Sequence, residues 1–190
     1  MSTSNSCILV LSQHFHPTLI GSAAYVTDFT RWLAEQGRSV LVVADRPFYP
    51  DYKIASGYEA GKRDREEVFG VDVMRLPTYV PDGGRALKRF VNEGVFLSGI
   101  VLRLLSGKIK RSSQVVSLCP SILTVLAASI ATKRSGRHVA IVHDIQSGLA
   151  AGLGLLGRGP VLRLLRTLER FALNRANHII VLSEHMREVL

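Results

Sequence analysis

The segment from Cys7 to Gly37, CILVLSQHFHPTLIGSAAYVTDFTRWLAEQG, joins an apolar run to an amphipathic stretch through a polar turn. Residues 7–11 are apolar throughout, which is typical of a buried strand. After the turn, apolar residues recur at helical spacing, at Val26, Phe29, Leu33 and Ala34. Gly37 then provides a helix stop signal. The segment therefore predicts a strand, a turn and a helix.

The same alternation continues to the end of the chain. Further apolar, β-branched runs predict strands at Val40–Ala44, Val71–Leu76, Gln114–Leu118, Val139–Val142 and Ile179–Leu182. Helices are predicted over about Arg85–Ser106, Ser121–Arg134 and Gly159–Arg175, with Gly136 ending the second of these. Six strands separated by helices predict an α/β fold with a doubly wound, Rossmann-like parallel sheet.

One stretch interrupts this regularity. A loop of about 20 residues from Asp45 to Glu67 carries three tyrosines and ends in a run of charges from Lys62 to Glu67. Loops of this length are usually functional or mobile, although a solvated excursion fits the composition equally well.

Composition limits the class of protein. A chain of 190 residues fits one domain, and its apolar runs all fall well short of the roughly 18 residues that span a bilayer. The first residues carry no basic region of a signal peptide, so we expect a cytoplasmic protein. Cys7 and Cys119 lack metal-ligand spacing and are expected to be small buried apolar residues. We expect no metal and no cofactor.

The net charge of +9 indicates a polyanionic partner. Aromatic and basic residues are not interleaved as in RNA-binding modules, which argues against nucleic acid. Seven cations bracket the apolar segment Val95–Leu105: Arg85, Lys88, Arg89, Arg103, Lys108, Lys110 and Arg111. Of these, Lys88, Arg89, Lys108 and Lys110 are the candidates for contact with a membrane or an acceptor. Such a helix can lie on an anionic membrane surface or can pack on the sheet with a basic solvent side, and both interpretations stay open.

Two turns at strand ends are candidate sites, because ligands of open parallel sheets bind beyond the carboxyl ends of strands. The first contains His16 and Gly21 and leads into the first helix, whose N-terminus favours an anion. It has no G-x-G-x-x-G pattern, which argues against a dinucleotide. The second begins with His143 and Asp144, whose side chains should point to opposite sides of the strand end. The other histidines, His138, His178 and His185, are expected at the surface or at strand edges.

At these residues the chain resembles the N-terminal half of family 4 glycosyltransferases of GT-B fold, closest to the bacterial type that builds exopolysaccharides such as colanic acid. The similarity spans the whole chain. The motifs that carry it are Pro17–Gly21, Tyr25, Trp32–Gly37, Pro47–Pro50, Arg65–Glu67, Leu76–Pro81, Leu87–Arg89, His143–Asp144, Leu168–Arg170 and Val181–Ser183.

The resemblance implies transfer of a sugar from a nucleotide-sugar to a saccharide or polyprenyl-linked acceptor, with retention of configuration and without a metal. It implies that Gly21 faces the donor phosphates, that His143 contacts the transferred sugar, and that Asp144 matches the aspartate that often follows this residue. We also expect Ser22, His16 and Tyr25 to contact substrate. Relatives commonly have a second glycine in the first loop, where this chain has Ser22, Ala23 and Ala24.

Residues 1–190 are thus expected to be a single acceptor-side domain without the C-terminal donor-binding domain, and to be inactive alone. Two alternatives remain: the acceptor-binding subunit of a split transferase, or a non-catalytic module that binds carbohydrate or a lipid carrier at the membrane. A peripheral position at the inner face of the plasma membrane fits all three.

Overall fold

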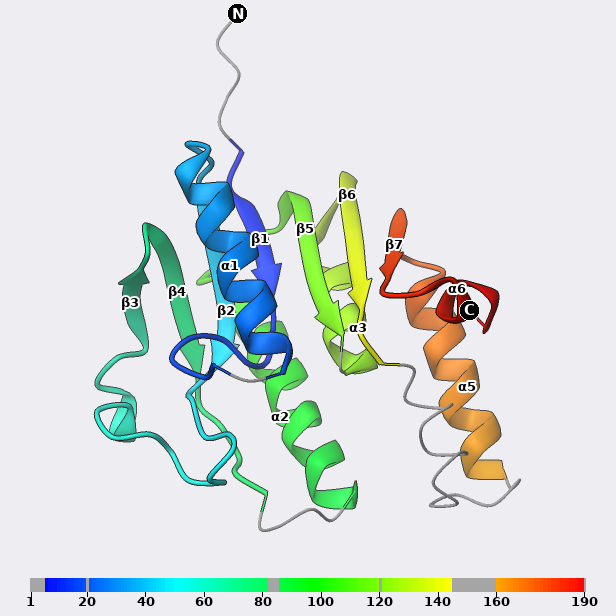
Figure 1. The fold of residues 1–190 in the computed structure, drawn as a ribbon, viewed down its shortest axis with the longest axis horizontal. Helices are drawn as coiled ribbons and strands as arrows, with labels where there is room; N and C mark the ends of the chain where they lie inside the picture. The colour runs from blue at the N-terminus through cyan, green and yellow to red at the C-terminus, as the bar shows by residue number, and fades with distance from the viewer. Residues whose placement is uncertain (1–5, 20, 82–85, 120, 145–159, 190) are drawn as a thin grey trace, which may run out of the picture.

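The computed structural model describes residues 6–19, 21–81, 86–119, 121–144 and 160–189. It contains a seven-stranded sheet in the order β3-β4-β2-β1-β5-β6-β7 (Figure 1). The strands are β1 (Ile8–Leu11), β2 (Val40–Asp45), β3 (Arg65–Val68), β4 (Val71–Leu76), β5 (Ser112–Cys119), β6 (Thr132–Val142) and β7 (His178–Val181). All neighbouring pairs are parallel except β3 and β4.

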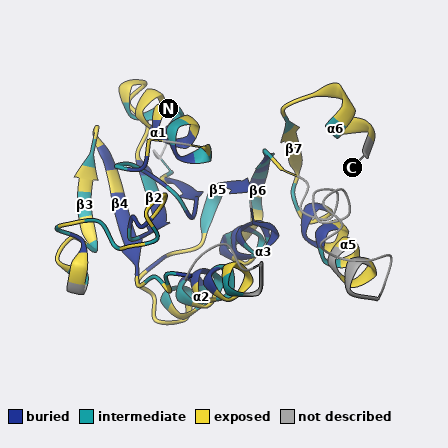
Figure 2. Cartoon of the chain, turned by 60° about the horizontal axis from the view of Figure 1, so that its bottom comes forward, coloured by how far each residue is buried: buried dark blue, intermediate teal, exposed yellow. Residues whose placement is uncertain are grey.

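Helices cover both faces of the sheet, as Figure 1 shows. They are α1 (Ser22–Glu35), the short 3₁₀ helix η1 (Glu59–Gly61), α2 (Ala86–Leu105), α3 (Ile122–Ala131), α5 (Pro160–Leu173) and α6 (Glu184–Val189). Successive residues of β1 serve opposite faces: Ile8 and Val10 pack with Val26 of α1, while Leu9 and Leu11 pack with side chains of α2 and α3. Burial is deepest in the central strands (Figure 2). The predicted doubly wound α/β sheet is confirmed.

The prediction of an all-parallel sheet of six strands is wrong at one edge. The charge run at the end of the Asp45–Glu67 loop forms β3, which pairs antiparallel with β4. Exposed Arg65 and Glu67 alternate with half-buried Glu66 and Val68. Edge strands commonly carry charges because charge discourages pairing with another chain. The sequence of β3 therefore resembled a solvated loop, and the strand was not predicted.

Three further expectations are corrected by the structure. The helix predicted to reach Arg134 ends at Ala131, and Gly136 lies in β6, where an added Cβ would come 3.0 Å from the Cα of Ser113. His138 is buried rather than at the surface, with Nε2 2.8 Å from the hydroxyl of Ser117. Cys119 is buried as expected, whereas Cys7 is exposed.

Candidate functional site

The candidate site lies at the carboxyl ends of the central strands. β1 has β2 on one side and β5 on the other. The chain therefore adds its next strands on one side of β1 and its later strands on the other side. Such a topological switch point opens a crevice between the loops that follow the strands. The residues after β1, β2 and β6 all reach this edge of the sheet.

Gly21 forms the N-cap of α1 with φ 62° and ψ −144°. No side chain caps the helix, and its first turn contains no acidic residue. A Cβ on Gly21 would meet open space, so the positive φ rather than crowding requires glycine here. The first N–H groups of α1 therefore lie beside an exposed backbone, an arrangement that suits an anion. Ser22 is the first residue of the helix and is half-buried.

Tyr25 and His143 meet beside this helix start. Their ring centroids are 5.4 Å apart with the planes at 77°, and the Tyr25 side chain is otherwise exposed. The backbone N–H of His143 donates to the carbonyl of Cys119, which holds the residue at the end of β6. Burial lowers the pKa of His143, and the nearby charge of Asp144 opposes that shift. The imidazole is therefore neutral near pH 7, with one nitrogen able to donate and the other to accept.

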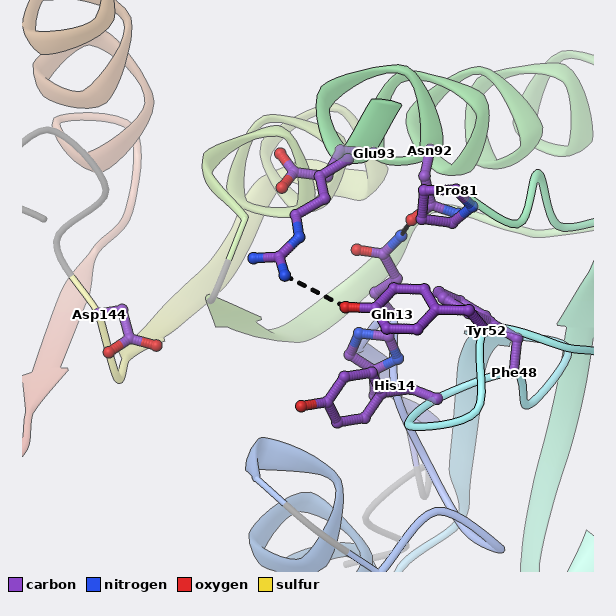
Figure 3. Close-up of a pocket in the computed structure, with 10 residues that line it drawn as sticks. Gln13, His14, Phe48, Tyr52, Pro81, Asn92, Glu93 and Asp144 are labelled. Atoms are coloured by element: carbon purple, nitrogen blue, oxygen red, sulfur yellow. Dashed lines mark hydrogen bonds between the residues drawn. The ribbon is translucent and has the colours of Figure 1, made fainter. Parts of the chain in front are cut away.

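A pocket of about 290 Å³, whose lining residues are drawn in Figure 3, includes Asp144, the residue that follows His143. Its lining combines aromatic and polar side chains from five segments of the chain: Gln13, His14, Phe48, Tyr49, Tyr52, Pro81, Arg89, Asn92, Glu93 and Asp144. Asp144 thus faces the pocket on the α2 side, whereas His143 faces Tyr25 of α1. The expectation that these two side chains point to opposite sides of the strand end is confirmed.

One wall of the pocket is a series of rings. His14 lies 5.4 Å from Phe48 and 5.6 Å from Tyr49, and Tyr49 lies 5.9 Å from Tyr52, all between ring centroids. Burial lowers the pKa of His14 to about 4, so this ring is uncharged at neutral pH. A wall of this kind offers flat apolar surface bordered by hydrogen-bonding groups.

The second tyrosine of this wall is held in an unusual conformation. Tyr52 has φ 52°, in the left-handed region that bulky residues rarely adopt, at a cost of about 1 kcal/mol or more. Its hydroxyl accepts a hydrogen bond from Arg89 at 3.1 Å (Figure 3). Arg89 is on α2, so this bond ties the long loop to the helix across the pocket.

The loop that carries the aromatic residues is anchored rather than freely solvated. Its backbone folds back on itself, with N–H groups of Lys53 and Ala55 donating to the carbonyls of Phe48 and Pro47. Arg46 holds the far end through two hydrogen bonds of 2.8 Å to the carboxylate of Asp64. The aromatic wall is therefore a defined surface.

A buried polar cluster supports the floor of the pocket. The amide of Gln13 donates to Asp45 Oδ2 at 3.0 Å and also contacts the amide oxygen of Asn92. Burial raises the pKa of Asp45 to about 8, against the hydrogen bond from Gln13 and the charge of Arg75, which both lower it. Arg75 is fully buried and pairs with Glu66 at 2.7 Å. The buried hydrogen bonds of this cluster thus orient two pocket residues, Gln13 and Asn92.

The structure does not bring every predicted site residue together. The ring of His16 packs edge-on against Phe69 at 5.1 Å, in the turn between β3 and β4, and is not part of the pocket lining. Lys88 and Arg89 lie near the start of α2, whereas Lys108 and Lys110 follow its end. A helix of 20 residues is about 30 Å long, so these cations form two separate groups.

Several pocket residues were not anticipated from the sequence. Asn92 and Glu93 lie within α2, where nothing in the pattern distinguishes them from other polar positions of a sheet-packing helix. Gln13 and His14 lie in the predicted turn after β1, and the tyrosines lie in the loop that was noted for its length. The sequence thus pointed to the segments that carry these residues, but it did not distinguish the individual pocket residues within them.

Neither a cluster of three or more potential metal ligands nor a helix long and apolar enough to cross a membrane occurs in the part of the chain that the structure describes.

Two known proteins are similar to this chain, one in sequence and one in structure. The chain is 30% identical over 183 residues to a protein of Escherichia coli (strain K12) named as a colanic acid biosynthesis glycosyl transferase, WcaI, covering 94% of this chain and 45% of the relative. In structure it matches sucrose-phosphate synthase from Thermosynechococcus elongatus with a TM-score of 0.65 at 14% identity, over 97% of this chain and 44% of that one. The chain therefore spans somewhat less than half the length of these proteins.

The structural match confirms the predicted GT-B-like fold. The glycosyl transferase 4-like domain family matches residues 21–190, which include Gly21, Tyr25, His143 and Asp144 and most of the residues that line the pocket. This chain belongs to the glycosyl transferase 4-like domain family.

Proposed function

We propose that this chain is the acceptor-side domain of a retaining, metal-independent glycosyltransferase that moves a sugar from a nucleotide-sugar to a saccharide acceptor. The pocket at the carboxyl ends of the strands is the acceptor site in this proposal. Its combination of an aromatic wall with convergent polar groups is the observation that carries the assignment.

Saccharides match this lining chemically. A sugar ring has an apolar face of C–H groups, which packs on aromatic rings, and an edge of hydroxyls, which need donors and acceptors. Tyr49 and Tyr52 offer the rings. Arg89 provides donors, Asp144 and Glu93 provide acceptors, and Asn92 provides both. A purely apolar ligand would leave these polar groups without partners.

In the proposed complex, the donor occupies the α1 side of the crevice. The exposed N–H groups at Gly21 and Ser22 face its diphosphate, where the positive end of the helix dipole favours negative charge. The neutral imidazole of His143 donates to a hydroxyl of the transferred sugar, and Tyr25 holds the ring in place. Asp144 lies on the acceptor side of the same strand end. The reacting carbon would then lie between His143 and Asp144.

The remaining binding energy for the donor is proposed to come from a second domain. The two similar proteins are each more than twice as long as the matched region. We propose that a donor-binding domain supplies the groups that neutralise the leaving diphosphate, and that this chain alone transfers little. By similarity to the colanic acid protein, the acceptor is proposed to be lipid-linked and the pathway to build an exopolysaccharide at the cytoplasmic face of the membrane.

Ligand-detected NMR with the chain alone tests the acceptor site. Saturation transfer to short oligosaccharides is expected for the wild type and is expected to be lost in Tyr49→Ala with Tyr52→Ala. Ile130→Ala, at an exposed apolar position on α3 outside the pocket, is the matched control. Calorimetry with nucleotide-sugars should show dissociation constants no better than about 1 mM. Unchanged saccharide signals in the double variant, or micromolar nucleotide-sugar binding, would refute the corresponding half of the proposal.

A further inference from the structure

A second pocket, of about 390 Å³, lies at the opposite edge of the sheet from the candidate active site. It is formed at the amino ends of β1 and β5 by Ser6, Cys7 and Leu9 on one side and by the segment after α2 on the other. β5 runs from Ser112 at this pocket to Cys119 at the candidate site, and strands rise about 3.3 Å per residue. The two pockets are thus separated by about 20 Å.

The lining of this amino-end pocket is strongly cationic. Four basic side chains contribute to it, Lys108, Lys110, Arg111 and Lys133, and none of the described lining residues is acidic. All four are exposed, and none forms an ion pair with any residue that the structure describes. Their positive charges are therefore not neutralised by ion pairs within the part of the chain that the structure describes.

The backbone builds this concentration of charge from two distant segments. Ser112 pairs with Thr132 and Gln114 with Arg137, so four residues of β6, 133–136, face a single residue of β5. This excursion carries Lys133 to the pocket. It packs closely on β5 because position 136 is glycine, where a Cβ would meet the backbone of Ser113 at 3.0 Å. Gly107, with φ 70°, turns the chain after α2 so that Lys108 follows at the pocket.

Holding four like charges around one pocket raises the electrostatic energy of the empty domain, and a bound anion relieves it. Ser113 lines the same pocket, and a hydroxyl group beside lysine and arginine matches the oxygens of a phosphate group. The hydroxyl of Ser112, which also lines the pocket, already donates to the carbonyl of Cys7 at 2.7 Å. A diphosphate carries enough negative charge to pair with several of these cations. A single phosphodiester headgroup pairs with one of them, and neighbouring headgroups of an anionic membrane surface can pair with the others.

We propose that the amino-end pocket is an anion-binding site for a phosphate-bearing ligand, separate from the glycosyltransferase site. Two sources share this chemistry, a soluble diphosphate and the headgroup of an anionic phospholipid. The exposed side chains of Leu102 and Leu105, at the end of α2 just before Lys108, are placed to enter a membrane beside a bound headgroup.

The two sources are distinguished by calorimetry with inorganic diphosphate and by co-sedimentation with vesicles of phosphatidylcholine, with and without phosphatidylglycerol. Saturable binding in at least one arm is expected, weakened by salt. Lys108→Glu with Lys110→Glu should weaken it by about tenfold or more, since each cation near an anionic surface contributes about fivefold in affinity and two are reversed. Leu102→Ser with Leu105→Ser should reduce vesicle binding only. Binding of diphosphate alone assigns the soluble ligand, and binding of vesicles alone assigns the headgroup.

Arg163→Glu with Arg166→Glu, at exposed positions of α5, makes the same change in net charge away from the pocket and should bind as the wild type does. Absence of binding in both arms overturns the proposal. Equal weakening of binding in this control also overturns it, because the loss of affinity would then follow from net charge and not from the pocket.

Cys7 provides an independent readout because it is exposed and lines the pocket, whereas Cys119 is buried with a pKa raised to about 12. Anionic iodoacetate should alkylate Cys7 faster, relative to neutral iodoacetamide, in the wild type than in Lys108→Glu with Lys110→Glu. A bound diphosphate should slow both reagents. An unchanged ratio of the two rates in the variant would show that the pocket does not concentrate anions.

Discussion

The ring of Tyr25 lies edge-on against the ring of His143, with centroids 5.4 Å apart. Tyr25 is on α1, which follows β1, and His143 follows β6, with β5 between these strands in the sheet. The start of α1 therefore reaches across the end of β5. This contact puts the N-terminal N–H groups of α1 and a neutral imidazole on one side of the crevice, where the proposed donor lies.

Replacing His143 tests this arrangement. In a protein that carries the donor-binding domain, His143→Ala should lower turnover about 100-fold, comparable to the loss of one positioned hydrogen-bond donor. The melting temperature should hardly change, because the side chain is only half-buried. Tyr25→Phe keeps the ring contact and should stay close to wild-type turnover. Wild-type turnover in His143→Ala, or a large loss of stability, would show that His143 is a packing residue.

The acceptor pocket is tested at Tyr52. Tyr52→Ala removes both the ring and the hydroxyl that accepts from Arg89, whereas Tyr52→Phe removes only the hydroxyl. Tyr52→Ala should raise the acceptor KM about tenfold, equivalent to about 1.4 kcal/mol, and Tyr52→Phe should raise it less. The donor KM should not change in either variant. Steady-state kinetics with each substrate varied separately provides the measurement, and an effect confined to the donor would contradict the assignment of the pocket.

Gly21 and Gly37 form a matched pair at the two ends of α1. Both have positive φ, 62° and 71°, and a Cβ at either would meet open space. Gly21→Ala and Gly37→Ala should therefore each cost about 1 kcal/mol of stability from backbone strain alone. Only Gly21→Ala should also reduce transfer, because its backbone is proposed to face the donor. Equal activities of the two variants, compared at equal folded fraction, would remove Gly21 from the site.

Asp45 makes the stability depend on pH above neutrality. Its pKa is raised to about 8, so between about 4 and 8 the folded chain holds a proton that the unfolded chain has lost, and stability falls as pH rises. Burial lowers the pKa values of His14 and His138 to about 4, so their contribution is lost as pH falls from about 6.5 to 4.

Stability should therefore be greatest near pH 6.5 and should fall toward pH 8 by up to about 1.4 kcal/mol per pH unit. Asp45→Asn mimics the protonated carboxyl and should abolish the fall in stability toward pH 8, while the rise between pH 4 and 6.5 that His14 and His138 cause becomes steeper. Urea unfolding across this pH range provides the test. An alkaline slope that persists in Asp45→Asn would assign it to another group.

The strands and helices were largely predictable because their signal is local. The runs that form β1 and most of β2 are apolar at consecutive positions, and such runs indicate strands buried on both faces. The failures occur where charge replaces that signal. Arg65–Val68 forms an edge strand despite three charges, and residues 132–137 continue β6 through a basic stretch that resembled the end of a helix.

The candidate site was predictable where it follows strand ends. Gly21, His143 and Asp144 were proposed as site residues because the end of a parallel strand is itself a local signal, and their roles stay predictions. The aromatic loop was found as a segment through its length. Asn92 and Glu93 were not found, because a position on α2 becomes part of the pocket only through the distance between that helix and the end of β1.

The sequence by itself determined the alternation of strands and helices, the chemistry available at each strand end and the excess of positive charge, since each depends on neighbouring residues or on composition. Only the tertiary structure decided which of these features meet. The order β2-β1-β5-β6 brings Tyr25 to His143 and puts Asp144 in the lining of the pocket that Glu93 also lines. Strand order is set by which faces can be buried together across the whole chain, and local periodicity does not encode it.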